Sequence, residues 1–146
     1  MITLAKALGS GVPVGACLTT ERVASSIKEN DLGTTFGGGM LAMAAVVATL
    51  EAIETDGMLA NVREVEAYLR EGLAGVEGVA GVRGRGLLLG VEFAEPVASK
   101  VQKSLLERRI ITGTSSDPKV LRLLPPLCLT KEEARTFIEV LKETLA

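Results

Sequence analysis

The chain has 146 residues, of which 47% are hydrophobic and 23% are charged, and this balance is typical of a folded chain with one or one and a half domains. A net charge of −2 and an aromatic content of 3% provide neither the basic surface nor the stacking side chains of a nucleic-acid-binding protein. Because the sequence contains no histidine, it excludes histidine-dependent nucleophilic catalysis and histidine-ligated metal sites. We expect no metal, no nucleic-acid partner and no membrane span.

The first third of the sequence predicts two strands, a small helix, a loop and a long helix. Residues 2–5 and 14–19 are apolar runs of strand length, and residues 21–30 form a polar run that predicts a short surface helix. Residues 31–39 contain four glycines and predict a loop whose backbone N–H groups can receive an anion. Residues 40–53 predict a helix that is apolar on nearly every side, which needs cover from a further domain or a partner subunit.

The remaining sequence predicts a small α/β unit that begins with an amphipathic helix. Apolar residues recur at steps of three and four from Met58 to Leu73, and Asp56 is placed to cap this helix. The boundary between the two parts should therefore fall within residues 55–65. We assign residues 1–55 to a first domain and residues 56–146 to a second.

Within the second part, the pattern alternates between strands and helices. The expected strands cover residues 79–85, 87–93, 110–112 and 120–124. One expected helix begins at Pro96, and the last begins after Thr130, whose spacing from Glu133 is that of a capping box. Cys17 and Cys128 are isolated from each other and lie in apolar runs, so we expect two buried thiols in a reducing compartment.

Lys6 lies where an apolar strand meets a loop that contains Gly9 and Gly11. Proteins of the α/β class often place reactive groups at strand ends. Desolvation or a neighbouring cation can free a lysine amine for Schiff-base chemistry. A surface lysine with a packed stem and a solvated head fits the same spacing. From spacing alone, both interpretations remain open.

Three segments of the sequence resemble class III, pyridoxal-phosphate-dependent aminotransferases, and they occur in the order of that family. The segments are Leu4-Ala5-Lys6-Ala7-Leu8-Gly9 with Pro13-Val14-Gly15-Ala16, then Gly33-Thr34-Thr35-Phe36-Gly37-Gly38, then Leu121-Arg122-Leu123-Leu124-Pro125-Pro126-Leu127. The similarity extends over essentially the whole chain and is greatest to the branch of the family that acts on N-acetylornithine. It implies that the chain begins in the middle of the family's fold, because the family's N-terminal half has no counterpart here.

The fold implied by the resemblance is the C-terminal part of a fold-type I pyridoxal-phosphate transferase, in the α/β class. It comprises the end of the large cofactor-binding domain and a small α/β domain, with a short, mostly antiparallel sheet covered by helices.

The resemblance also implies a role for three residues. Lys6 would bind pyridoxal 5'-phosphate covalently and act as the base that moves the substrate's α-proton. Thr35 would reach the cofactor phosphate of the neighbouring subunit with its hydroxyl and N–H. Arg122 would hold the substrate's α-carboxylate through two parallel hydrogen bonds. Alternation along its strand does not decide whether Arg122 faces the core or solvent.

The activity implied is transfer of an amino group from N-acetylornithine or a similar diamino acid to 2-oxoglutarate, in the cytoplasm, by a homodimer that serves arginine biosynthesis. The alternatives within the family are a donor such as ornithine, 4-aminobutyrate or another ω-amine, or a semialdehyde aminomutase. For the isolated chain, a further alternative is an inactive truncated subunit or a binding module. In each of these interpretations the isolated chain is expected to lack transaminase activity.

Overall fold

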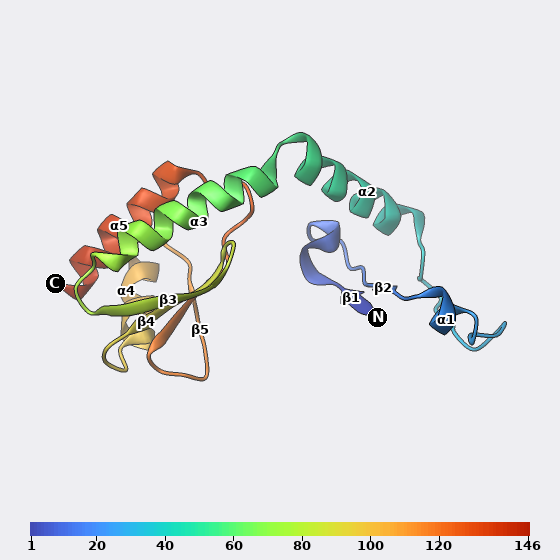
Figure 1. Ribbon diagram of the computed structural model, residues 1–146, viewed down its shortest axis with the longest axis horizontal. Helices are drawn as coiled ribbons and strands as arrows, with labels where there is room; N and C mark the ends of the chain where they lie inside the picture. Colours follow the sequence, from blue (N-terminus) through green and yellow to red (C-terminus); the bar gives the residue numbers. More distant parts are fainter. The chain divides into compact units, whose positions relative to one another are not determined.

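The computed structural model describes residues 1–146 and divides them into two compact units, Met1–Asp56 and Gly57–Ala146 (Figure 1). The first unit opens with two short strands, β1 (Ile2–Leu4) and β2 (Ala16–Leu18), which pair in antiparallel fashion. A 3-10 turn, η1 (Lys6–Gly9), follows β1 directly. The two strands lie within the apolar runs that predicted them, and the turn lies at the start of the predicted loop.

The other elements of the first unit are two helices of very different length. α1 (Glu21–Ala24) is a single turn, and α2 (Met40–Thr55) is the long helix that its composition predicted. No residue of α2 is buried, and Met40 and Leu41 are 90% and 77% exposed. Within its own unit, this apolar helix is therefore largely uncovered.

The second unit is a two-layer α/β structure with a four-stranded sheet. Its helices are α3 (Met58–Ala74), α4 (Ala98–Glu107) and α5 (Lys131–Leu145). Its strands are β3 (Val79–Arg85), β4 (Leu88–Phe93), β5 (Gly113–Thr114) and β6 (Val120–Leu123), in the spatial order β3-β4-β6-β5 with every pair antiparallel. The expectation of a short antiparallel sheet covered by helices is confirmed.

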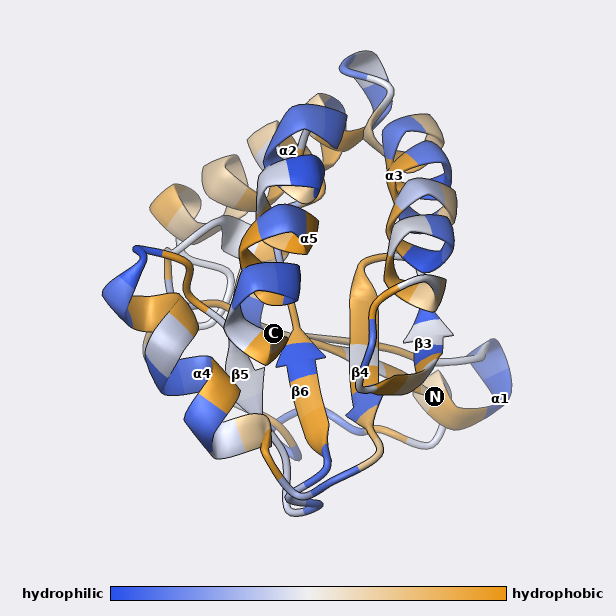
Figure 2. Cartoon of the chain, turned by 90° about the vertical axis from the view of Figure 1, so that its left-hand side faces the viewer, coloured by the Kyte–Doolittle hydropathy of each residue, from blue (hydrophilic) through white to orange (hydrophobic).

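The core of this unit lies between the helices and one face of the sheet. Alternate residues of β4 are buried, and so are Leu121 and Leu123 of β6, whereas Leu88 and Leu124 are more than half exposed. The helices are correspondingly amphipathic, and hydrophilic and hydrophobic residues alternate along α4 and α5 in Figure 2. Each large side chain buried in this way contributes about 1.5–3 kcal/mol of transfer free energy. The other face of the sheet, apart from Val120, remains largely exposed.

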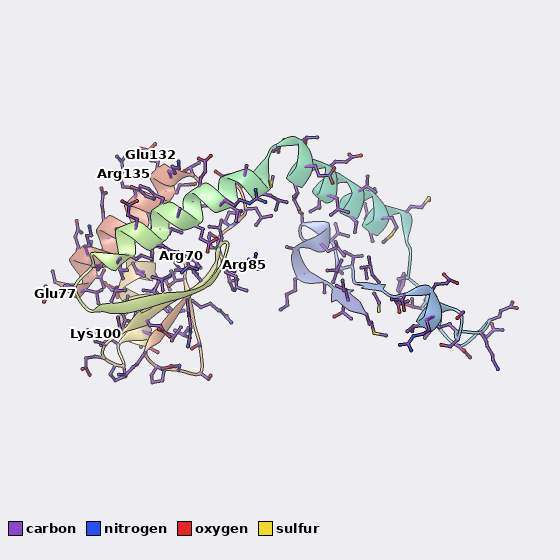
Figure 3. All side chains as sticks on the ribbon, in the orientation of Figure 1. Arg70, Glu77, Arg85, Lys100, Glu132 and Arg135 are labelled. Atoms are coloured by element: carbon purple, nitrogen blue, oxygen red, sulfur yellow. The ribbon has the colours of Figure 1, made fainter.

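Polar contacts fasten the β3–β4 hairpin to α3. Arg70 donates from Nη1 to the carbonyl of Val82 at 2.8 Å and from Nη2 to the carbonyl of Gly84 at 2.8 Å. Glu66 pairs with Arg70 at 2.9 Å and accepts a hydrogen bond from the N–H of Gly86 at 2.8 Å. Figure 3 shows Arg70 reaching from α3 toward β3, with Arg85 at the end of the hairpin. The hairpin is thereby held to the helix that packs over it.

The predicted capping box at the start of α5 is present. The N–H of Glu133 donates to Thr130 Oγ1 at 3.2 Å, and the N–H of Thr130 donates to the Glu133 carboxylate at 2.8 Å. Thr130 Oγ1 also donates to the carboxylate at 2.8 Å. The hydrogen bonds from the backbone N–H and the hydroxyl of Thr130 hold the pKa of Glu133 below its ordinary value. No helix in the structure is both long enough and apolar enough to span a membrane.

The predicted cap of α3 and the predicted strand at residues 110–112 are wrong. Asp56 follows the last residue of α2, and the residue before α3 is Gly57, whose φ of 64° lies in the left-handed region that favours glycine. Residues 110–112 form backbone hydrogen bonds with α4 and not with a neighbouring strand. The N–H of Ile110 donates to the carbonyl of Leu105, and Gln102 donates to the carbonyl of Thr112. Sheet pairing therefore begins only at Gly113.

The expectation of buried cysteines is also wrong. Cys17 and Cys128 are free thiols, and both are exposed. Cys17 lies in β2, where every residue is exposed because nothing in its unit covers the two-stranded sheet. Cys128 lies in a turn closed by a hydrogen bond from the N–H of Leu129 to the carbonyl of Pro126. Although both cysteines have apolar neighbours in the sequence, neither is buried in the fold.

Candidate active site

Lys6 has an unusual backbone conformation at the junction of β1 and η1. Its φ is 59°, in the left-handed region, which costs a residue with a side chain about 1–2 kcal/mol. Such strain persists where the surrounding structure imposes it, and it is concentrated at functional sites. The side chain is exposed and takes part in none of the ion pairs of the chain. The amine is thus accessible to a ligand.

The turn that carries Lys6 contacts α2 and ends in a tightly packed glycine. Gly9 is buried, and a Cβ added to it would lie 2.8 Å from Val14 Cγ1 and 3.9 Å from Ala45 Cβ. Contacts under 3.0 Å essentially never occur for a real Cβ, so no other residue fits here without a shift of its neighbours. The close packing against Val14 requires this glycine, whereas a Cβ would make only an ordinary contact with Ala45 of α2.

A pair of hydroxyl groups adds a polar anchor next to the packed glycine. Thr49 Oγ1 donates to the carbonyl of Ala45 at 2.7 Å, so its one proton is already used. The hydrogen bond of 3.0 Å between Ser10 Oγ and Thr49 Oγ1 therefore has Ser10 as its donor. Ser10 itself is left-handed, with φ 46°. Ser10, strained like Lys6, is thus held by a hydrogen bond to α2.

Thr35 lies in the glycine-rich turn that leads into α2. The N–H groups of Thr35 and Phe36 donate to no backbone oxygen, and the Thr35 side chain is exposed. Gly39 precedes the helix without a side-chain cap, so the first N–H groups of α2 are open. A hydroxyl, free amides and the positive end of a helix dipole together fit a phosphate group, which is the anionic part of pyridoxal phosphate.

Arg122 lies on the exposed face of the sheet in the second unit. Its neighbours Leu121 and Leu123 are 0% and 6% exposed, which places Arg122 on the opposite side of β6. The guanidinium forms none of the ion pairs in the chain and lies against Gly113 of β5, the neighbouring strand. An unpaired guanidinium on an open sheet face is suited to a carboxylate, which it can hold by two parallel hydrogen bonds.

The three predicted residues are divided between the two units. Lys6 and Thr35 belong to Met1–Asp56, where η1 contacts α2 and the Thr35 turn precedes it, while Arg122 belongs to Gly57–Ala146. An apolar hollow of about 320 Å³ lies in the second unit beside α5, and none of the three residues lines it. No group of three acidic or cysteine side chains is placed to hold a metal ion.

The supporting residues of these sites were not found from the sequence. The anchor formed by Ser10 and Thr49 joins residues 39 positions apart, and the contact of Arg122 with Gly113 depends on strand register. The one signal in the sequence was Gly113, which follows the predicted strand at residues 110–112, because glycine in a strand often marks a close approach of another group.

The chain matches the family model described as aminotransferase class-III over residues 1–145. It is 44% identical to acetylornithine aminotransferase 1 of Bordetella bronchiseptica (strain ATCC BAA-588 / NCTC 13252 / RB50) over 145 residues, which cover 97% of this chain and 36% of that protein. The solved acetylornithine aminotransferase from Elizabethkingia anophelis superposes with a TM-score of 0.87 and 26% identity, covering 97% of this chain and 39% of that one.

A solved ornithine delta-aminotransferase of Plasmodium falciparum superposes with a TM-score of 0.85 and 33% identity, covering 98% of this chain and 38% of that one. The chain thus spans little more than a third of the length of these proteins.

Proposed function

The chain belongs to the class III aminotransferase family, and from this premise we propose that the complete protein transfers the amino group of N-acetylornithine, or a similar diamino acid, to 2-oxoglutarate. Relatives named acetylornithine aminotransferase, at 36–44% identity, support this choice of donor. The observation that carries the proposal is Lys6 itself: a lysine in a strained conformation, exposed and unpaired, on a turn anchored to α2.

Each of the three residues has a distinct task in the proposed reaction. Pyridoxal phosphate, when bound, would supply an electron sink for the charge left at the substrate carbon that carries the transferred amino group. Lys6 holds the cofactor through Nζ and moves a proton at that carbon, since an amine can serve as both nucleophile and base. Thr35 donates to a cofactor phosphate oxygen, and Arg122 orients the substrate by its α-carboxylate. Positioning by Arg122 contributes to rate because the carbon must lie within reach of the lysine.

The remaining features of the proposal concern the assembly and its setting. We infer a homodimer in which Thr35 reaches the cofactor phosphate of the other subunit, acting in the cytoplasm in arginine biosynthesis. Residues 1–55 are assigned to the end of a large cofactor-binding domain and residues 56–146 to a small C-terminal domain. The exposed apolar surface of α2 supports burial of this helix in the complete protein, because an uncovered surface of this kind is unfavourable in water.

A second candidate function is transamination of ornithine at its δ-amino group. The solved structures that resemble this chain include ornithine aminotransferases from Plasmodium falciparum and Plasmodium yoelii, at 33% and 31% identity. The two functions are separated by measuring kcat/KM of the complete enzyme with N-acetylornithine and with ornithine. A preference for ornithine would replace the first proposal by the second.

The role of Lys6 is tested by chemical trapping in the complete enzyme. Borohydride reduction in the presence of pyridoxal phosphate, followed by digestion and mass spectrometry, should find the pyridoxyl group on Lys6. Lys28, on the same unit, is the internal control and should remain unmodified. A pyridoxyl group on any other lysine, with Lys6 unmodified, contradicts the assignment.

The shared site is tested by mixing two inactive variants. Subunits with Lys6→Ala and subunits with Thr35→Ala should regain part of the activity when hybrid dimers form, since one of the two sites in each hybrid is then intact. Hybrid dimers that are demonstrably present but inactive would show that Thr35 does not act across a subunit boundary.

A further inference from the structure

Two arginines and two glycines form a single row across the sheet of the second unit. Arg83 of β3 pairs with Gly90 of β4, Gly90 pairs with Arg122 of β6, and Arg122 pairs with Gly113 of β5. Residues paired in register on neighbouring strands point to the same face of a sheet. The row lies on the exposed face, because the residues on either side of Arg122 in β6 are buried. Long cationic side chains thus alternate with positions that have no side chain.

Each arginine of the row lies against the glycine beside it. A Cβ on Gly90 would be 3.1 Å from Val120 Cγ1, which is tight, whereas its distances of 3.5 Å to Arg83 Cγ and 3.7 Å to Arg83 Nε are ordinary contacts. A Cβ on Gly113 would be only 3.2 Å from Arg122 Nε and 3.4 Å from Arg122 Nη2. The guanidinium of Arg122 therefore lies so close to Gly113 that a side chain there would force it to shift by a few tenths of an ångström.

The two arginines differ in what else holds them. Arg83 Nη1 is paired with Glu92 Oε1 at 2.9 Å, so a carboxylate of the chain fixes its position. Arg122 has no such partner. Arg122 instead packs against Gly113, which has no side chain. This contact leaves the hydrogen-bonding groups of Arg122 free for a ligand.

The backbone supplies no other reason for a glycine at position 113. Its φ is not among the positive values found at six other glycines, so an alanine could adopt the same conformation. Glycine within a strand is unfavourable, because it loses more conformational entropy than other residues. A glycine in an ordinary strand conformation, in contact with an unpaired guanidinium, points to a requirement for space.

We propose that Gly113 is the positioning residue for Arg122, and that its missing side chain lets the guanidinium lie across β5 in the orientation that receives the substrate carboxylate. This inference rests on the proposed function of Arg122 in binding a carboxylate. Bidentate binding depends on the plane of the guanidinium as well as on its charge. A methyl group at position 113 displaces the flexible end of Arg122 and leaves the sheet in place.

The test compares Gly113→Ala with Gly75→Ala in the complete enzyme. Gly75 is a matched control because it belongs to the same unit, has φ −96°, and has open space where a Cβ would lie. We expect Gly113→Ala to unfold at a denaturant concentration no lower than that of Gly75→Ala. We also expect its kcat/KM for both amino donor and 2-oxoglutarate to fall by about tenfold, the effect of about one hydrogen bond to a charged group, whereas Gly75→Ala retains the wild-type value.

Crystal structures of the two variants provide a readout that does not depend on activity. A guanidinium of Arg122 that shifts away from residue 113 in Gly113→Ala but stays in place in Gly75→Ala, together with the loss of kcat/KM, supports the inference. An unmoved guanidinium overturns it. A moved guanidinium with unchanged kcat/KM also overturns it, provided that Arg122→Lys lowers kcat/KM. If Arg122→Lys has no effect either, the proposed carboxylate site fails, while the steric relation between Gly113 and Arg122 stands on the crystal structures.

Discussion

The two units of the chain differ most in where their apolar side chains lie. Every buried hydrophobic residue belongs to Gly57–Ala146, while the one buried residue of Met1–Asp56 is Gly9. α2 is apolar around its circumference and has no buried residue, whereas α3 concentrates its apolar residues on one side and buries three of them. The second unit therefore has a core of its own, and the first unit presents an apolar surface that needs cover.

The proposed site residues are divided between the same two units. Lys6 and Thr35 lie on the unit without a core, and Arg122 lies on the unit with one. Strained or mobile functional segments are commonly drawn from the less stable parts of a protein, while a residue that only orients a ligand benefits from a rigid support. The comparison suggests that local stability will be low around the lysine and high around the arginine, and three experiments examine this difference.

The largest expected difference is in hydrogen exchange of the 146-residue chain. Amides of β4 and β6 should exchange only on global unfolding of their unit, because their side chains form its core. Amides of α2 should open locally at little cost, since none of its residues is buried. A free-energy gap of about 4 kcal/mol or more corresponds to protection that differs by roughly 10³-fold. Equal protection, independent of protein concentration, would contradict the comparison.

A matched pair of leucine truncations should show the next largest effect. Leu121 is 0% exposed and Leu41 is 77% exposed. We expect Leu121→Ala to lower the free energy of unfolding by about 2–5 kcal/mol, because it leaves a cavity, and Leu41→Ala to change it by no more than about 0.5 kcal/mol.

Urea unfolding of the second unit can be followed by the fluorescence of Tyr68, the sole tyrosine in a chain without tryptophan, which packs against the core. Circular dichroism follows the helices of both units. A similar loss of stability in the two variants would show that Leu41 is covered in solution.

The smallest effect should come from two helix caps. Thr130 caps α5 through its hydroxyl, while Thr20 precedes α1 without any side-chain hydrogen bond. Thr130→Ala should therefore cost about 1 kcal/mol, and Thr20→Ala should have almost no effect. The same urea titrations measure both changes, and an equal cost for the two threonines would contradict the cap assigned to α5.

The cap of α5 also predicts a dependence on pH with a definite sign. Hydrogen bonds from Thr130 lower the pKa of Glu133 in the folded chain. The carboxylate therefore contributes stability above its ordinary, unfolded pKa, and this contribution is lost as the pH falls through the lower, folded value. The difference between the wild type and Thr130→Ala should shrink in acid. Glu133→Gln is the control, because it removes the titrating group, and a difference that grows in acid would contradict the prediction.

Much of the fold could be predicted from sequence because its signals are local. The spacing of apolar residues in α3 and α5, the capping box at Thr130 and the glycines of the β3–β4 hairpin each act over a few residues. The same holds for the segment around Lys6, whose residue types indicated a strand followed by a turn. Hydrogen bonds within a helix or a tight turn join near neighbours, so residue order determines them directly.

Other features were decided only when distant segments came together. Alternation along β6 allowed Arg122 either face of the sheet, and the helices packed on Leu121 and Leu123 placed it on the exposed one. The contact of Arg122 with Gly113 requires β5 to pair with β6 in one register. That pairing begins only at Gly113, because the N–H of Ile110 is hydrogen-bonded to the end of α4. Sequence period sets which residues share a face, but burial of one face against other elements decides which face meets solvent.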